Sequence, residues 1–135
     1  MLARYLLDTD ICIYLRKNDR PKITERFAAL DRDEVAVSVI TLGELAFGMA
    51  KSANPVQAQQ GIAWVMHVAR ILPLTSEAAR YYGEIRGALS GAGNIIGPND
   101  LWIAAHALAE NLILVTNNER EFRRVKGLKV ENWAR

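Results

Sequence analysis

Four acidic side chains of this 135-residue chain lie next to short apolar segments. They are Asp8, Glu44, Asp100 and Glu121. Carboxylates that lie close together repel one another and raise one another's pKa unless a cation neutralises them. The sequence offers no His or Cys cluster beside them, and oxygen ligands alone favour Mg²⁺ or Mn²⁺ over Zn²⁺. If the fold brings the four acids together, they therefore predict a site for Mg²⁺ or Mn²⁺.

Short apolar segments alternate with helical patterns along the chain, which is typical of an α/β fold with a mostly parallel sheet. Residues rich in Val, Ile and Leu predict strands near 4–7, 35–40, 71–74, 112–116 and 128–130. Helical patterns cover residues 11–17, a segment from 21, and residues 42–49, 55–70, 76–89, 100–109 and 119–125. We therefore predict four or five strands, helices on both faces of the sheet, and a single domain spanning residues 1–135.

Three of the acids follow predicted strands. Asp8 comes directly after the first strand, Glu44 lies four residues after the second, and Glu121 follows the strand at 112–116. The carboxyl ends of parallel strands meet at one edge of a sheet, where ligands bind in open sheets of this kind. Asp100 begins a helix instead of following a strand, so connectivity alone does not place it at this edge.

Each acid also has a simpler structural interpretation, which stays open at this point. Asp8 or Asp10 could cap the helix that follows, and a T-x-x-E capping box could account for Glu44. Asp100 could favour the dipole of its helix from the first turn. Glu121 could be one charge on a surface helix. A shared edge of the sheet weakens these separate interpretations when the four acids are considered together.

The overall composition excludes several classes of protein. Half of the residues are hydrophobic and 24% are charged, as in an ordinary folded soluble domain. No apolar run is long enough to span a bilayer, and the first residues lack the cleavage site of a signal peptide. The single cysteine, Cys12, cannot form an internal disulfide, so we expect a buried thiol and a reducing cytoplasm.

Two groups of basic residues stand out, although a net charge of +2 is too mild to imply nucleic-acid binding by itself. The first contains Arg16, Lys17, Arg20, Lys22 and Arg26, and the second contains Arg120, Arg123, Arg124, Lys126 and Lys129. Two interpretations stay open, because such groups are either solvated surfaces or binding sites for phosphate.

Four sequence blocks occur in the order LLDTDICI, SVITLGELAFG, IGPNDLWIAAHALA and LILVTNNEREF. In this order they resemble the PIN-domain ribonucleases, and more narrowly the VapC toxins of bacterial toxin–antitoxin pairs. The resemblance covers essentially the whole chain, and IGPNDLWIAAHA is its most specific block. It implies a three-layer α/β/α fold and an endoribonuclease that uses Mg²⁺ or Mn²⁺.

The resemblance also implies which acids bind the metal. Three match the family's metal-binding positions directly: Asp8, Glu44 and Asp100. The fourth position is a departure, because many members carry an aspartate where this chain has Asn118. Glu121, which precedes Phe122, fits a second family pattern with Glu in place of Asp, and Glu119 is a weaker candidate.

Further roles follow from the same resemblance. Asp10 is expected to cap the first helix and to orient the site, while Thr9 and Thr116 hold the acids or a water. No side-chain nucleophile is evident, so hydrolysis by water would leave 5′-phosphate and 3′-hydroxyl ends. The arginines expected to contact the RNA backbone are Arg120, Arg123 and Arg124, whereas Arg86 is expected either to bind phosphate or to pair with an acid.

The family implies partners as well as a reaction. VapC toxins commonly cut tRNA, and two blocks of this chain look most like members that act on initiator tRNA. A small VapB-like antitoxin covers the active site, and the complex, usually with a toxin dimer, binds operator DNA through the antitoxin. Apolar residues that could make such contacts are Tyr14, Leu15, Phe47 and Met49, although core packing explains them equally well.

Three alternatives remain. The departure at Asn118 allows a non-catalytic PIN scaffold that binds RNA or protein, and the sequence also allows a housekeeping PIN nuclease without an antitoxin. The D-x-D start at Asp8 and Asp10 matches haloacid-dehalogenase-type phosphatases, but Cys12 fails the fifth position of that signature and no clear lysine motif follows.

Overall fold

The structure, a computed structural model, describes residues 3–135. In this range the chain forms a five-stranded sheet in the order β3-β2-β1-β4-β5, and every strand pair is parallel. The strands are β1 (Tyr5–Leu7), β2 (Val35–Ser38), β3 (Arg70–Leu72), β4 (Ile113–Val115) and β5 (Val130–Glu131). The α/β prediction with a mostly parallel sheet of four or five strands is confirmed.

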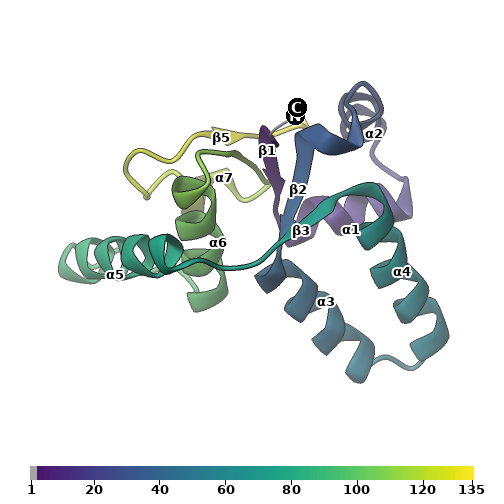
Figure 1. Cartoon of the computed structure of the whole chain (residues 1–135), viewed down its shortest axis with the longest axis horizontal. Helices are drawn as coiled ribbons and strands as arrows, with labels where there is room; N and C mark the ends of the chain where they lie inside the picture. Colours follow the sequence, from purple (N-terminus) through teal and green to yellow (C-terminus); the bar gives the residue numbers. More distant parts are fainter. Residues whose placement is uncertain (1–2) are drawn as a thin grey trace.

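Helices cover both faces of this sheet, as Figure 1 shows. They are α1 (Thr9–Lys17), α2 (Pro21–Ala28), α3 (Val39–Ala50), α4 (Pro55–Val68), α5 (Ser76–Gly91), α6 (Pro98–Ala109) and α7 (Glu119–Phe122), with a 3₁₀ turn η1 (Arg32–Glu34) before β2. Among residues 3–135 no helix is long and apolar enough to cross a membrane.

Two apolar cores hold the three layers together. Leu6 of β1 belongs to the core that α5 and α6 cover, whereas Tyr5 and Leu7 belong to the core that α1, α2 and α4 cover. Successive side chains of a strand point to opposite faces, so a strand that is covered on both sides is apolar throughout. This arrangement buries every residue of β1 and β2 and fixes the carboxyl ends of both strands.

The second strand ends earlier than its apolar run predicts. Ser38 closes β2, and its hydroxyl accepts a hydrogen bond from the N–H of Ile40 at 3.1 Å, so α3 begins at Val39. The predicted strand to residue 40 and the capping box of Thr41 and Glu44 are therefore wrong, because Ser38 already supplies the cap. Glu44 consequently lies in the second turn of α3.

The first helix also starts earlier than predicted. Asp8 is its N-cap, and the Asp8 carboxylate accepts a hydrogen bond from the N–H of Thr9 at 2.8 Å. The prediction that Asp10 caps this helix is wrong. Because Asp8 directly follows β1 and caps α1, its side chain has little conformational freedom.

Candidate active site

The structure brings the four predicted acids to the edge of the sheet where β1 and β4 end. They are Asp8 at the end of β1, Glu44 on α3, Asp100 in the first turn of α6, and Glu121 on α7. Burial raises the pKa of Asp100 to about 8, and the nearby carboxyls of Glu121, Asp8 and Glu44 contribute in that direction. Asp100, which connectivity alone did not place, therefore shares the site with the other three.

Asp8 is the most buried of these acids, with 6% of its surface exposed. Its Oδ1 accepts from the Thr9 N–H, and its Oδ2 accepts from the Thr116 hydroxyl at 2.8 Å. Burial and the neighbouring charge of Asp10 raise the pKa of Asp8 to about 7, although the two hydrogen bonds oppose this shift. The carboxylate is fixed in place, and none of residues 3–135 forms an ion pair with it.

Thr9 connects the first two acids. Its backbone N–H binds Asp8, and its hydroxyl donates to Glu44 Oε1 at 2.6 Å and lies 3.0 Å from the Thr41 hydroxyl. This contact turns Glu44 toward the end of β1. The expected role of the Thr9 hydroxyl in holding an acid agrees with this geometry.

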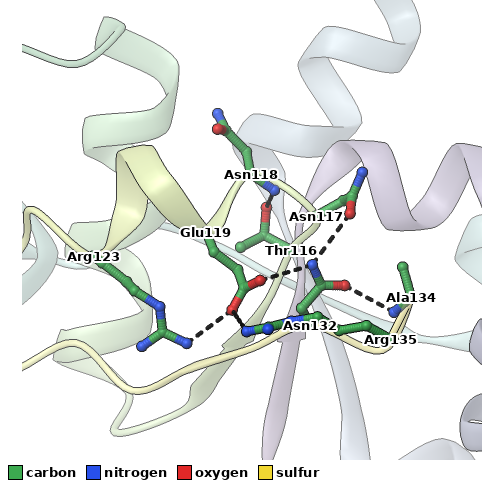
Figure 2. Close-up of polar contacts among 8 residues, drawn as sticks. All are labelled: Thr116, Asn117, Asn118, Glu119, Arg123, Asn132, Ala134 and Arg135. Carbon is green, nitrogen blue, oxygen red and sulfur yellow. Dashed lines mark hydrogen bonds and ion pairs between the residues drawn. The ribbon is translucent and has the colours of Figure 1, made fainter.

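Glu121 and Glu119 were both candidates for the fourth acid, and the structure separates them. Glu121 Oε1 accepts from the Gly97 N–H at 3.1 Å, at the start of α6, and its Oε2 accepts from the Asn118 amide. Glu119 instead binds Arg123, Arg135 and Asn132 (Figure 2). These contacts lower the pKa of Glu119 to about 2 and leave Glu121 as the acid beside Asp100.

Asp10 has a different role from the one predicted. Its Oδ2 accepts a hydrogen bond from the N–H of Asn117 at 3.1 Å, which joins α1 to the loop after β4. Its Oδ1 is buried and lacks a hydrogen-bond partner among residues 3–135. Burial raises the pKa of Asp10 as well. The side chain therefore places a further carboxylate close to Asp8.

The donor set fits a hard divalent cation held at an open site. Within the described residues no Lys or Arg forms an ion pair with the four acids, and no group of three or more His, Cys, Asp or Glu side chains is arranged so that it could hold a metal ion by itself. Mg²⁺ does not need a closed cage, because it is usually bound by one or two carboxylates and keeps several waters. The raised pKa values of Asp8 and Asp100 indicate that a positive charge would stabilise this cluster.

The predicted RNA-binding arginines lie in different surroundings. Arg86 donates to the hydroxyl of Tyr82 at 2.7 Å, and Arg124 donates to the carbonyl of Ile95 at 3.2 Å. Arg86 and Ile95 line a cavity of about 150 Å³ beside the start of α6. Arg123 pairs with Glu119, and Arg120 is exposed.

Other predicted residues have structural roles. The Cys12 thiol is buried as predicted, and burial raises its pKa. His106 is buried on α6 with its Nδ1 2.8 Å from the Ser38 hydroxyl, whereas His67 is exposed. Leu15, a candidate for partner contacts, is buried in the core and is therefore unavailable to a partner.

Sequence reasoning missed several groups that hold this site. Three of them contact acids: the Gly97 N–H, the Asn117 N–H and the Asn118 amide. The fourth, Asn132, donates to Asn117 in the loop after β4. Backbone donors carry no signature of residue type, and Asn132 stands 15 residues from its partner Asn117. The contact of Asn118 with Glu121 spans only three residues and could have been read locally, whereas no local pattern identifies the others.

Known proteins resemble this chain along nearly its whole length. The PIN domain family model matches residues 5–128. "Ribonuclease VapC2" of Rickettsia felis is 40% identical over 96% of this chain and 97% of its own. "tRNA(fMet)-specific endonuclease VapC" of Shigella flexneri is 39% identical over 98% of this chain and 100% of its own.

Solved structures agree with these sequence matches. In the crystal structure of DNA-bound VapBC from Salmonella typhimurium, the matching chain is 38% identical and gives a TM-score of 0.91 over 98% of this chain and 99% of its own. In the crystal structure of VapBC2 from Rickettsia felis bound to a promoter DNA fragment, the matching chain is 38% identical and gives a TM-score of 0.88 over 96% of this chain and 98% of its own. Both structures share the fold that positions the four acids.

Proposed function

Because the chain belongs to the VapC ribonucleases of the PIN-domain family, we propose that it is a metal-dependent endoribonuclease that cleaves tRNA. One observation carries the metal dependence. Four carboxyls, Asp8, Glu44, Asp100 and Glu121, lie at one edge of the sheet, and two of them have a strongly raised pKa. A cluster of this kind favours a divalent cation.

The residues of this chain divide the work of phosphodiester hydrolysis. Asp8 and Asp100 would be the principal ligands for Mg²⁺ or Mn²⁺, and Glu44 and Glu121 would complete the set. A bound cation of this type supplies an activated water and neutralises charge on the phosphate. Thr9 and Thr116 hold their acids in fixed orientations through hydrogen bonds of 2.6–2.8 Å.

Protons compete with a cation for these acids, so metal binding should strengthen as the pH rises from about 6 toward 8. Burial and the neighbouring acids raise the pKa of Asp100 to about 8, and a bound cation would favour its ionised form. Water attacks phosphorus and the bond to the 3′-oxygen breaks, which leaves a 5′-phosphate and a 3′-hydroxyl.

The RNA substrate is proposed from the relatives and from the rim of the site. Two relatives carry names that specify tRNA(fMet), which supports an initiator tRNA substrate for this chain. Arg86 and Arg124 lie close to the loop that leads into α6, where they can receive the RNA backbone. Arg120 is exposed on α7 and can contact RNA directly. Arg123 can do so only after its ion pair with Glu119 breaks.

A small VapB-like antitoxin is the proposed protein partner, because the solved relatives include VapBC complexes with DNA. A cavity of about 160 Å³ between α1, α3 and α4 offers it an apolar surface, and Phe47 on α3 is 65% exposed. A cationic side chain of the antitoxin could neutralise the four acids. Operator binding through the antitoxin, a toxin homodimer and a cytoplasmic location belong to the same proposal.

Cleavage of a total tRNA pool tests this function. Purified protein with Mg²⁺ or Mn²⁺ should give discrete cuts that EDTA, Asp8→Asn and Asp100→Asn each abolish in folded protein. Glu110→Gln is the matched control. Glu110 lies at the opposite end of α6 from Asp100, so this variant should remain active. Tight tRNA binding without cleavage by the wild type would instead favour the non-catalytic scaffold. Cleavage that survives both substitutions would refute the site.

A further inference from the structure

Asn132, just after β5, connects the C-terminal segment to the loop after β4. Its Nδ2 donates to Asn117 Oδ1 at 3.2 Å and to Glu119 Oε2 at 3.0 Å, as Figure 2 shows. Its Oδ1 accepts from the N–H of Ala134 at 2.8 Å. Every polar atom of this side chain is thereby used, and both donor hydrogens are directed at the loop and the start of α7.

Glu119 is the common partner in this group of contacts. Its side chain is only 16% exposed, whereas the two arginines that bind it, Arg123 and Arg135, are 57% and 72% exposed. Ion pairs with such exposed arginines contribute little to stability, because solvent screens them and the side chains remain mobile. The contact between Asn132 and Glu119 is therefore the more persistent part of the group.

The opposite side of the same loop contacts the acids of the site. Thr116 donates to Asp8, and the Asn117 N–H donates to Asp10. The Asn118 N–H donates to the Thr116 hydroxyl at 2.9 Å, and the Asn118 amide holds the Glu121 carboxylate. Each loop residue thus has a direct role in placing an acid. A displacement of this loop would move the partners of Asp8 and Glu121 together.

We propose that Asn132 and Glu119 are positioning residues that hold the loop Thr116–Asn118 in the geometry required for metal binding and RNA cleavage. This inference rests on the proposed ribonuclease function. Neither side chain touches the four acids, so both act through the loop. Displacements of about 1 Å at a reacting centre can cost about 100-fold in rate, which makes such support consequential.

Asn132→Asp tests the contact with almost no change of shape. It replaces a donor by an oxygen that faces Glu119 and Asn117, so repulsion should displace the loop. We expect kcat for tRNA cleavage to fall about 10-fold to 100-fold with KM within about 3-fold. Mn²⁺ affinity should weaken at least about 5-fold, and the amides of the loop should exchange hydrogen faster, since the loop loses its support.

Reversing the donor and acceptor tests whether the contact itself matters. In the double variant Asn132→Asp with Glu119→Gln, the new amide can donate to the new carboxylate while the contact with Asn117 Oδ1 stays lost, so kcat and Mn²⁺ affinity should each recover at least about 3-fold over Asn132→Asp alone. Glu131→Gln is the matched control. It removes the charge from the side-chain contacts of the same segment with Arg26 and Trp133, its side chain makes none with the loop, and it should lower stability slightly without lowering kcat.

The outcomes separate the positioning role from a purely structural one. Wild-type kcat and Mn²⁺ affinity in Asn132→Asp, failure of the double variant to recover, or an equal loss in Glu131→Gln would each overturn the proposal. If Asn132→Asp does not fold, Asn132→Ala removes the same contacts and carries the same expectations. If wild-type protein binds Mn²⁺ but does not cleave tRNA, the proposed function fails, while Mn²⁺ affinity and hydrogen exchange still decide the positioning role.

Discussion

The Thr116 hydroxyl joins Asp8 to the loop after β4, and its removal should have a measurable effect. It donates to Asp8 Oδ2 at 2.8 Å and accepts from the Asn118 N–H at 2.9 Å. The residue is fully buried, so water cannot replace the lost contact. Thr116→Val removes the hydroxyl and keeps the shape of the side chain. Asp8 then keeps only the Thr9 N–H as a hydrogen-bond donor among the contacts described above.

The expected magnitude follows from the charge of Asp8. A hydrogen bond to a charged group contributes about 1.5–3 kcal/mol. One factor of ten in rate corresponds to about 1.4 kcal/mol, so kcat should fall about 10-fold to 100-fold if this bond holds Asp8 in its reacting orientation. The pKa of Asp8 should rise further, because the bond from Thr116 lowers it. The free energy of unfolding should fall by about 1–3 kcal/mol.

Single-turnover cleavage of tRNA at saturating Mn²⁺, together with urea unfolding, measures both effects. Thr116→Ser keeps the hydroxyl and should stay within about 3-fold of the wild-type rate, since the donor to Asp8 is retained. Wild-type cleavage by folded Thr116→Val would refute the idea that this hydroxyl positions Asp8. An equal loss in Thr116→Ser would assign the effect to side-chain packing instead.

Other predictions follow from the same charges. Metal-free Asp100→Asn should melt at a higher temperature than wild type near pH 8, because it removes one of several repelling carboxylates, and it should not cleave tRNA. Raising the pH from about 5 to about 8 should lower the thermal stability of the metal-free wild type. Asp8 and Asp100 release their protons in the folded state with pKa values of about 7 and about 8, whereas the unfolded acids have already done so near pH 4. Mg²⁺ should therefore raise the melting temperature more near pH 8 than near pH 6. Arg86→Ala and Arg124→Ala should each weaken tRNA binding and reduce its dependence on salt, as measured by filter binding.

Strand order and burial explain which acids the sequence could place. The apolar runs predict β1 and β2, and the pairing of Tyr5 with Val35 puts the ends of these strands side by side. Asp8 and Glu44 follow from that geometry. Asp100 does not, because its position depends on the loop between α5 and α6 and on the bond between Gly97 and Glu121. That bond spans 24 residues, and no local pattern encodes it.

The errors in the sequence predictions share one physical cause. Asp8 and Asp10 both have the residue type of a helix cap, so propensity alone cannot choose between them. The choice depends on Asn117, which stands 107 residues from Asp10 and whose N–H donates a hydrogen bond to the Asp10 carboxylate. Ser38 likewise ends β2 early, because its hydroxyl caps α3 and lies within hydrogen-bonding distance of His106 Nδ1. In each case a tertiary contact decided between two locally acceptable structures.

Direct measurement of Mn²⁺ binding tests whether the four acids hold a divalent cation. Electron paramagnetic resonance of free Mn²⁺, titrated with purified protein near pH 8, gives the affinity without RNA or antitoxin. Wild type and Glu110→Gln should bind Mn²⁺ equally, and folded Asp8→Asn and Asp100→Asn should each bind at least about 10-fold more weakly, since each loses a proposed ligand. Equal Mn²⁺ affinity in wild type and both variants, or no binding by the folded wild type, would contradict a metal site at this edge of the sheet.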